Sequence, residues 1–549
     1  TGGRDAQAAE GSPEDNGPDK GEAKPVAVQI DLKGLGQRIV ALPMPARSYL
    51  GLQATREKLY FMELLPNQAE GSGQGLYALH AYDLKERKCD VVRPKIRHYW
   101  ISHNGKKMLY ENEQPGDWHL VDTKPTPESR DTQLSLEGLH VYVDPRAEWR
   151  QMYDEVYRIQ RDFLYDAHMH GLDWKAACEK YRPFLDHVGH RSDLNYLFME
   201  LLGELVIGHA RAGGGDLPHG AGYVPGGLLG ADLELADGLY RIRRIYAGLN
   251  WHPELRSPLT EPGVHAAEGE YILEIDGRPL DASINVHSLL VMCADKTTEL
   301  LLSPVPVAPG EPLPEEAHRE QVVPLASETS LRHWSWVEGN RHRVDELSEG
   351  RVAYVYMFNT SLQGYQDFNR YYFAQLDKQA VVLDERFNGG GSAADYVIDV
   401  LDRPLLCHWA TREGQPFHTP NASIFGPKVM IVNEWAGSGG DAMPLFFRRR
   451  GLGKLVGKRT WGGLVGVYDY PVLMDGGTVT APRMAIFSPE NEWEVENVGV
   501  APDIEVEMTP KLVIAGRDPQ LEKAVEIVLE ELAANPPPAM RRPAPALRV

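Results

Sequence analysis

The sequence has little that would mark a membrane, disulfide-rich or nucleic-acid-binding protein. None of its apolar runs approaches the roughly 18 to 20 residues of a membrane helix. It has only four cysteines in 549 residues, and no CxxC pair, which excludes a disulfide framework and predicts free thiols. Lysine and arginine total 57 against 78 acidic residues, and the resulting formal charge of −21 argues against nucleic acid and anionic membranes as partners.

Several chemistry-bearing motifs are also absent. No GK[ST] or GxGxxG pattern follows a strand, so neither a phosphate-binding loop nor a dinucleotide site is predicted. The histidine pairs in HMH (168–170) and HVGH (187–190) lack acidic residues at the spacing of a zinc-binding helix. The sequence therefore predicts no cofactor and no metal.

The length predicts several domains in a multidomain α+β chain. Residues 1–25 are acidic and rich in glycine and proline, which predicts a disordered tail or loop, and the proline-rich residues 536–549 predict a second tail. Residues 26–125 alternate short strands and turns, as β-propeller blades of about 40 residues do. Because a closed propeller needs about four blades, we expect a terminal part of one.

Helical periodicity begins after this strand-rich segment and predicts a helical domain over 145–215. A helix capped by Ser192 is expected to end at Gly208, which would place His209 at its C-terminus. Residues 220–310 then return to strands, with a hairpin turn at Asp237-Gly238. The order of strands and one short helix in this segment resembles a PDZ domain, a module that binds peptide ends.

Strands and helices alternate from 331 to 535, which predicts an α/β catalytic domain with a mostly parallel sheet. Two glycine-rich loops follow strands of this domain, where ligand sites of such sheets lie. In NEWAGSGGDA (433–442), Ser438 occupies a strand-to-helix turn that misses the GxSxG pattern at Ala436. RFNGGGS (386–392) offers exposed backbone N–H groups of the kind that form an oxyanion hole.

Four ordered motifs, LDERFNGGG, VNEWAGSGGDA, GLGKLVGKRTWGG and VENVGVAPDIEV, resemble the tricorn protease family and, more widely, the carboxyl-terminal-processing peptidases. The order of the predicted domains is similar too, so the chain is expected to be the C-terminal half of such a peptidase. The resemblance implies Ser438 as nucleophile, His209 as its base and Glu496 as the acid that supports the base. It also implies that the backbone N–H groups of Gly391 and Gly439 form the oxyanion hole.

Two departures from the family pattern bear on these expectations. The family has a serine before its histidine that links it to the glutamate, and Gly208 stands there in this chain. Glu496 is therefore expected to reach His209 directly or through water. The family's acid for basic side chains in the first substrate pocket falls near Trp409, which predicts a weaker preference for basic residues.

Three functions stay open at this point. The first is a serine endopeptidase that cleaves oligopeptides or unfolded polypeptide with a Ser/His/Glu triad. The second is a carboxyl-terminal-processing protease with a Ser/Lys dyad, for which Lys454 and Lys458 are the candidates. The third is a non-catalytic scaffold that binds peptides. Peptides are the expected partners, and the resemblance implies a homo-oligomer of the hexameric kind that the family forms. The expected compartment is the cytoplasm, or the periplasm if a leader is removed.

Overall fold

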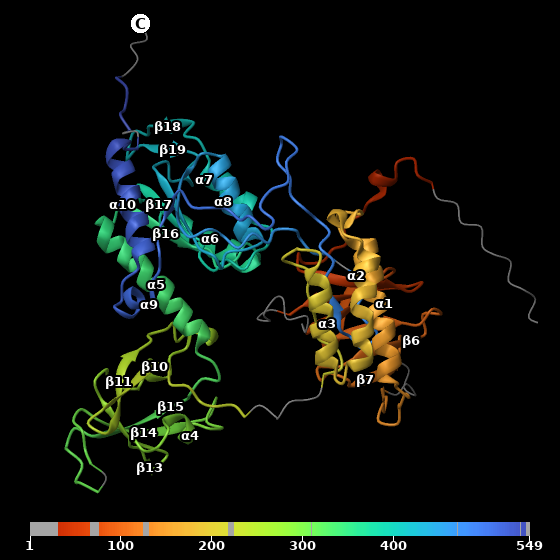
Figure 1. The fold of residues 1–549 in the computed structure, drawn as a ribbon, viewed down its shortest axis with the longest axis horizontal. Coiled ribbons are helices and arrows are strands. Elements are labelled where there is room, and N and C mark those ends of the chain that lie inside the picture. The colour runs from red at the N-terminus through yellow and green to blue at the C-terminus, as the bar shows by residue number, and fades with distance from the viewer. Residues whose placement is uncertain are drawn as a thin grey trace, which may run out of the picture. The chain divides into compact units, whose positions relative to one another are not determined.

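The computed structural model describes residues 31–65, 76–124, 131–217, 224–308, 310–468, 470–537 and 540–544. Two compact units divide the chain, residues 1–142 and residues 143–549 (Figure 1). Each is described on its own. The predicted tail at 1–25 lies outside the described residues, and so does part of the tail predicted at 536–549.

The first unit contains two four-stranded antiparallel sheets whose strands pair in chain order. Their inward residues share one core, which includes Tyr60, Leu79 and Met108. Each sheet has the size and strand order of one propeller blade, but membership of a propeller stays a prediction. The strands are β1 (Tyr49–Ala54), β2 (Lys58–Leu64), β3 (Tyr77–Asp83), β4 (Lys88–Ile96), β5 (His98–Ile101), β6 (Lys107–Glu111), β7 (Trp118–Asp122) and β8 (Thr132–Gln133), after a 3₁₀ turn at Leu35–Arg38.

The second unit begins with three α-helices, α1 (Pro145–Phe163), α2 (Trp174–Tyr181) and α3 (Arg191–Gly203). The Asp144 carboxylate caps α1 by accepting the N–H of Ala147, and one apolar face of each helix is buried. Four residues from much later in the chain complete this core, namely Val465, Leu473, Val479 and Ala481. The late segment also adds β22 (Thr478–Val479), which pairs antiparallel with β9 (Ala212–Gly213). The helical part therefore depends on residues that follow both glycine-rich loops in sequence.

A small antiparallel sheet follows, and it has the hairpin predicted from the sequence. Asp237 and Gly238 form its turn with positive φ angles of 54° and 77°. Buried leucines and isoleucines from the strands and from the helix α4 make a separate core. The elements are β10 (Ala231–Ala236), β11 (Leu239–Ile245), β12 (Tyr271–Ile275), β13 (Arg278–Pro279), α4 (Val286–Leu289), β14 (Thr298–Ser303) and β15 (His318–Val322).

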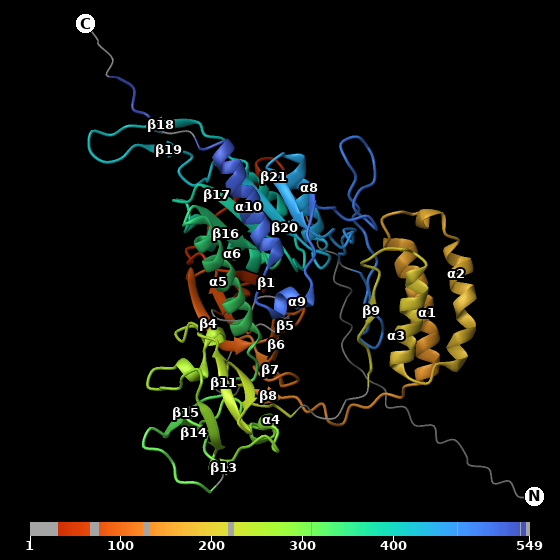
Figure 2. The same ribbon diagram turned by 60° about the vertical axis from the view of Figure 1, so that its left-hand side comes forward.

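A parallel five-stranded sheet forms the predicted catalytic part, in the order β16-β17-β20-β21-β23. Helices pack on both faces, with α5 and α10 together on one of them (Figure 2). The predicted parallel α/β sheet is confirmed. The elements are α5 (Thr329–Ser348), β16 (Val352–Tyr356), α6 (Leu362–Phe373), β17 (Ala380–Asp384), α7 (Ala394–Leu401), β18 (Cys407–Trp409), β19 (Phe417–Thr419), β20 (Lys428–Val432), α8 (Gly439–Arg449), β21 (Gly453–Gly457), β23 (Ile504–Glu505), α9 (Pro510–Ile514) and α10 (Pro519–Ala534).

The two glycine-rich loops follow β17 and β20, which are neighbours in this sheet. Because both strands run the same way, the loops emerge at one edge and can touch. Among the described residues, no helix combines the length and the apolar character needed to cross a bilayer.

Candidate active site

Ser438 lies at the turn between β20 and α8 in a backbone conformation that non-glycine residues rarely adopt. Its φ and ψ angles are 58° and −115°. The N–H of Ser438 donates to the Asp441 carboxylate at 2.9 Å and to the carbonyl of Gly463 at 3.1 Å. A strained residue that the surrounding structure holds in place is typical of functional sites, and of nucleophiles on sharp strand-to-helix turns in particular.

Asp441 is the residue that holds this turn, and sequence reasoning missed it. Its carboxylate is fully buried and accepts the N–H groups of Gly462 and Gly463 at 2.8 and 3.1 Å, besides that of Ser438. Burial raises the pKa of Asp441, and the hydrogen bonds that it accepts oppose the rise. Its position three residues after Ser438, at the start of a helix, is the capping signal that could have identified it.

The second loop packs directly on the Ser438 turn. The carbonyl of Asn388 accepts the N–H of Gly437 at 3.0 Å, which joins the two loops. A Cβ atom placed on Gly390 would lie 2.7 Å from the Cβ of Ser438, closer than such atoms approach. Only a glycine at this position allows the loop to lie against the candidate nucleophile.

The two predicted oxyanion donors lie beside each other. A Cβ placed on Gly439 would fall 2.8 Å from the backbone nitrogen of Gly391. Gly439 is the first residue of α8, so its N–H has no partner within the helix. In the described part of the chain no acceptor is recorded for the N–H of Gly391. Two donors next to Ser438 are what an oxyanion hole requires, and their role there stays a prediction.

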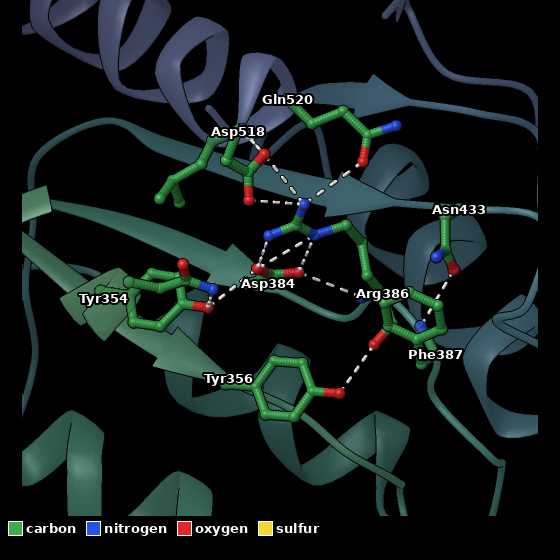
Figure 3. Close-up of polar contacts among 10 residues, drawn as sticks. Tyr354, Tyr356, Asp384, Arg386, Phe387, Asn433, Asp518 and Gln520 are labelled. Carbon is green, nitrogen blue, oxygen red and sulfur yellow. Dashed lines mark hydrogen bonds and ion pairs between the residues drawn. The ribbon is translucent and has the colours of Figure 1, made fainter. Parts of the chain in front are cut away.

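A buried ion-pair network supports the second loop from beneath (Figure 3). Arg386 is 2% exposed, and its guanidinium binds the carboxylates of Asp384 at 2.6 Å and Asp518 at 2.8 Å. The hydroxyl of Tyr354 donates to Asp384 at 2.8 Å, and that of Tyr356 to the carbonyl of Arg386 at 3.0 Å. Asp518 caps α10, so the loop is fixed to the C-terminal helix. The sequence signal for this anchor is a pair of charged residues, Asp384 and Arg386, at the end of a buried strand.

The structure corrects the expected position of His209. Helix α3 begins at Arg191 with His190 as its cap, rather than with Ser192, and it ends at Gly203, well before Gly208. His209 lies in a later turn, and its backbone carbonyl accepts a hydrogen bond from the Thr480 hydroxyl. The cause is that Leu205, Ile207 and Ala210 turn into the core that residues 465–481 complete, so the chain leaves the helix early.

The His209 ring is half-buried against Trp461, with the ring centres 5.3 Å apart. Its Nδ1 atom is buried and has no hydrogen-bond partner among the residues that the structure describes. Burial lowers the pKa of His209, the nearby Arg211 lowers it further, and Glu496 acts in the opposite direction. A neutral imidazole near neutral pH is the form that can accept a proton.

Glu496 approaches His209 through the backbone. One carboxylate oxygen accepts the N–H of Gly208 at 2.8 Å, and the other accepts those of Leu464 and Val465 at 2.8 and 2.9 Å. The acid thus holds the residue before His209 to the segment that follows Trp461. The expected hydrogen bond from Glu496 to the ring is not recorded among the described residues, and the role of Glu496 stays a prediction.

The remaining candidates lie elsewhere. Trp409 is 53% exposed on the β18–β19 hairpin, which projects from the body of the catalytic part (Figure 2), and its indole N–H donates to Thr419 at 2.7 Å. Lys458 pairs with Glu505 and Glu507 at 2.5 and 2.8 Å. Lys454 is exposed on β21. Within the described residues no cluster of three metal-ligating side chains occurs.

Comparison with known families agrees with this geometry. Residues 145–203 match the tricorn protease C1 domain, 227–308 the tricorn protease PDZ domain and 351–506 peptidase family S41. Three domains of the tricorn-type S41 peptidases are thus recognised in this chain. Tricorn protease homolog 1 of Streptomyces coelicolor is 34% identical over 536 residues, which cover 93% of this chain and 48% of the relative.

Two further relatives extend the likeness. A putative tricorn-like protease C-terminal subunit of Sulfurisphaera tokodaii is 29% identical over 514 residues, covering 92% of this chain and 58% of the relative. The crystal structure of the tricorn protease superposes with a TM-score of 0.78 at 27% identity, over 88% of this chain and 46% of that one. The chain spans about half the length of most curated relatives that it matches.

Proposed function

We propose that this chain is an active serine endopeptidase that hydrolyses oligopeptides or unfolded polypeptide through an acyl-enzyme. One observation carries the proposal: a strained Ser438 lies in contact with a loop whose Gly391 nitrogen adjoins Gly439, the first residue of α8. In such a site the Ser438 hydroxyl attacks the scissile carbonyl while His209 takes its proton. The tetrahedral oxyanion then accepts hydrogen bonds from the N–H groups of Gly391 and Gly439.

The second half of the reaction returns the site to its starting state. His209 gives its proton to the leaving amine, the peptide bond breaks and an ester to Ser438 remains. His209 next takes a proton from water, the hydroxide adds to the ester carbonyl and the acid product leaves as Ser438 regains its proton. Glu496 supports the imidazolium by its charge and by fixing the Gly208 backbone.

The Ser/Lys alternative has less support. A lysine base must be neutral, and the hydrogen bonds that Lys458 donates to the carboxylates of Glu505 and Glu507 raise its pKa. Lys454 lies on β21, against which α10 packs, and near Glu531 of that helix: burial raises the pKa of Glu531, and the charge of Lys454 opposes the rise. Lys458 is held in two ion pairs and Lys454 is exposed, so neither lies in the buried, unpaired setting expected of a lysine base.

The PDZ-like part adds a peptide-binding surface to the proposal. A cavity of about 720 Å³ lies between β10 and α4, lined by apolar residues such as Leu229 and by the polar Arg243 and Asn285. A groove of this kind next to a strand accepts an extended peptide. A chain that only binds peptides in this groove is the alternative function, and the test below distinguishes it from an enzyme. Assembly into an oligomer stays a prediction.

Active-site labelling with a fluorophosphonate tests the proposal. The wild-type chain is expected to form one covalent adduct, which Ser438→Ala abolishes and His209→Ala slows strongly. Labelling that survives His209→Ala but is lost in Lys454→Ala or Lys458→Ala would instead identify a dyad. A folded wild-type chain that never labels would identify a scaffold and contradict the proposal.

A further inference from the structure

The Trp461 ring lies between the turn that carries His209 and the turn that carries Ser438. Its ring packs edge-to-face on His209 at 5.3 Å, and the Arg211 guanidinium lies over it at 5.5 Å. The backbone N–H of Trp461 donates to the carbonyl of Ala436 at 2.9 Å, so the residue is also fixed to the Ser438 turn. It is 38% exposed.

Three glycines make the room for this ring. A Cβ on Gly208 would lie 2.9 Å from Cη2 and Cζ2 of the indole, and a Cβ on Gly437 would lie 2.5 Å from its Cε3. Gly463, which follows in the same turn, meets the ring at a similar distance. The indole therefore touches the residue before His209 at one side and the residue before Ser438 at the other. No larger side chain fits at either position while the ring stays where it is.

We propose that Trp461 is a positioning residue that sets the place of the His209 imidazole relative to Ser438. The inference rests on the proposed function for its catalytic consequence. Glu496 fixes the backbone beside His209, and within the described part of the chain Nδ1 of the ring has no hydrogen-bond partner. The orientation of the imidazole thus depends on packing, and the indole of Trp461 is the aromatic ring that packs on it.

The contact with Trp461 also limits the exposure of the His209 ring to water. Trp461 shields one side of the ring from water, while the charged groups that act on it are Arg211 and Glu496. Removal of the indole exposes the imidazole, so its proton affinity rises toward that of a free histidine. Because the base must be neutral to act, the acid limb of the pH profile then moves to higher pH.

Labelling rates across the pH range test this inference. We expect Trp461→Ala to lower the limiting second-order rate constant for a fluorophosphonate about 10-fold and to raise the midpoint of its acid limb by about 0.5 to 1 pH unit. Trp461→Phe keeps an aromatic ring, so its rate constant and midpoint should fall between those of the wild type and those of Trp461→Ala. The control is Trp435→Ala, which removes a tryptophan that is 70% exposed beside the same turn and should match the wild type.

A double-mutant cycle with Gly208→Ala sharpens the test. The new Cβ displaces the indole, so Gly208→Ala should resemble Trp461→Ala, and adding it to Trp461→Ala should cost little more. Effects that simply add, or a Trp461→Ala profile equal to that of Trp435→Ala, would overturn the inference.

An NMR titration of ¹³C-labelled histidine separates this inference from the proposed function. The His209 signal is assigned by its loss in His209→Ala. A wild-type chain that fails to label contradicts the proposed function, but a raised His209 midpoint in Trp461→Ala would still support the packing role. An unchanged midpoint would overturn it.

Discussion

The nucleophile side and the base side of the site are built in different ways. Ser438 stands on a loop between a buried strand and a helix of one sheet, and the Asp441 carboxylate holds its backbone from below. His209 stands on a turn whose neighbours are held by residues from far later in the chain, among them Glu496 and Thr480. The first side is held by the sheet and by residues that follow it closely in sequence, whereas the second depends on residues 465–481 (the docking segment) and on Glu496.

This difference predicts how each side fails. Damage to the Ser438 side should remove chemistry while the chain stays folded, because the sheet core lies apart from the loops. Damage to the docking segment should loosen the helices α1–α3 as well as the site, since residues 465–481 belong to their core.

The largest expected effect comes from the base. His209→Ala should lower kcat/KM for a peptide substrate by about 10³-fold or more, because the Ser438 hydroxyl is a poor nucleophile without a proton acceptor. Circular dichroism should show an unchanged fold. His187→Ala is the matched control, since that histidine is exposed on the same helical part. A small loss, or an equal loss in the control, would remove His209 from the reaction.

The second effect tests the oxyanion loop. Gly391 has a φ of 135°, and a Cβ there collides with the backbone of Thr360. Gly391→Ala should therefore move the donor and lower kcat about 10²- to 10³-fold with little change in KM. Gly389→Ala is the control in the same loop, because a Cβ at that position meets open space. Equal kinetics for the two variants would contradict the assignment.

The comparison also explains what the sequence could predict. The glycines of both loops and the apolar strands before them are local signals, so the parallel sheet and the neighbourhood of Ser438 follow from pattern alone. Nothing local to His209 identifies it. The contact between Gly208 and Glu496, and the packing of Val465 and Val479 among the helices, are long-range choices that only the family resemblance could suggest. The early end of α3 has the same origin.

A third prediction concerns the docking segment. Arg191 at the start of α3 pairs with Asp475 at 2.5 Å, and both side chains are almost fully buried. Arg191→Ala leaves that carboxylate without its partner and should destabilise the helical part by about 3 kcal/mol, with a loss of activity of about 10-fold at most. Urea unfolding measures the first and peptide hydrolysis the second. Lys175→Ala, which removes an exposed ion pair in α2, should change neither.

The same ion pair gives the comparison a pH dependence. Burial tends to raise the pKa of Asp475, but hydrogen bonds from Arg191 and from two backbone N–H groups lower it below its usual value. A carboxyl group whose pKa is lower in the folded state stabilises the fold above its unfolded pKa of about 3.9, and this contribution is lost as the pH falls through the folded value. Acid unfolding of Asp475→Asn should therefore depend less on pH below about 4 than that of the wild type.

The smallest expected effect concerns substrate specificity. The residue tested, Trp409, lies on the β18–β19 hairpin, which is part of neither the Ser438 side nor the His209 side of the site. Trp409 stacks on Phe417 at 6.2 Å and exposes about half of its surface. If its indole meets the first substrate side chain, Trp409→Asp should raise kcat/KM for lysine over leucine at that position several-fold, about 1 kcal/mol, with kcat almost unchanged. Trp251→Asp adds the same charge at an exposed tryptophan of the PDZ-like part and is the control. Equal shifts in both variants would show a general field of the added charge, and no shift in Trp409→Asp would place the first pocket elsewhere.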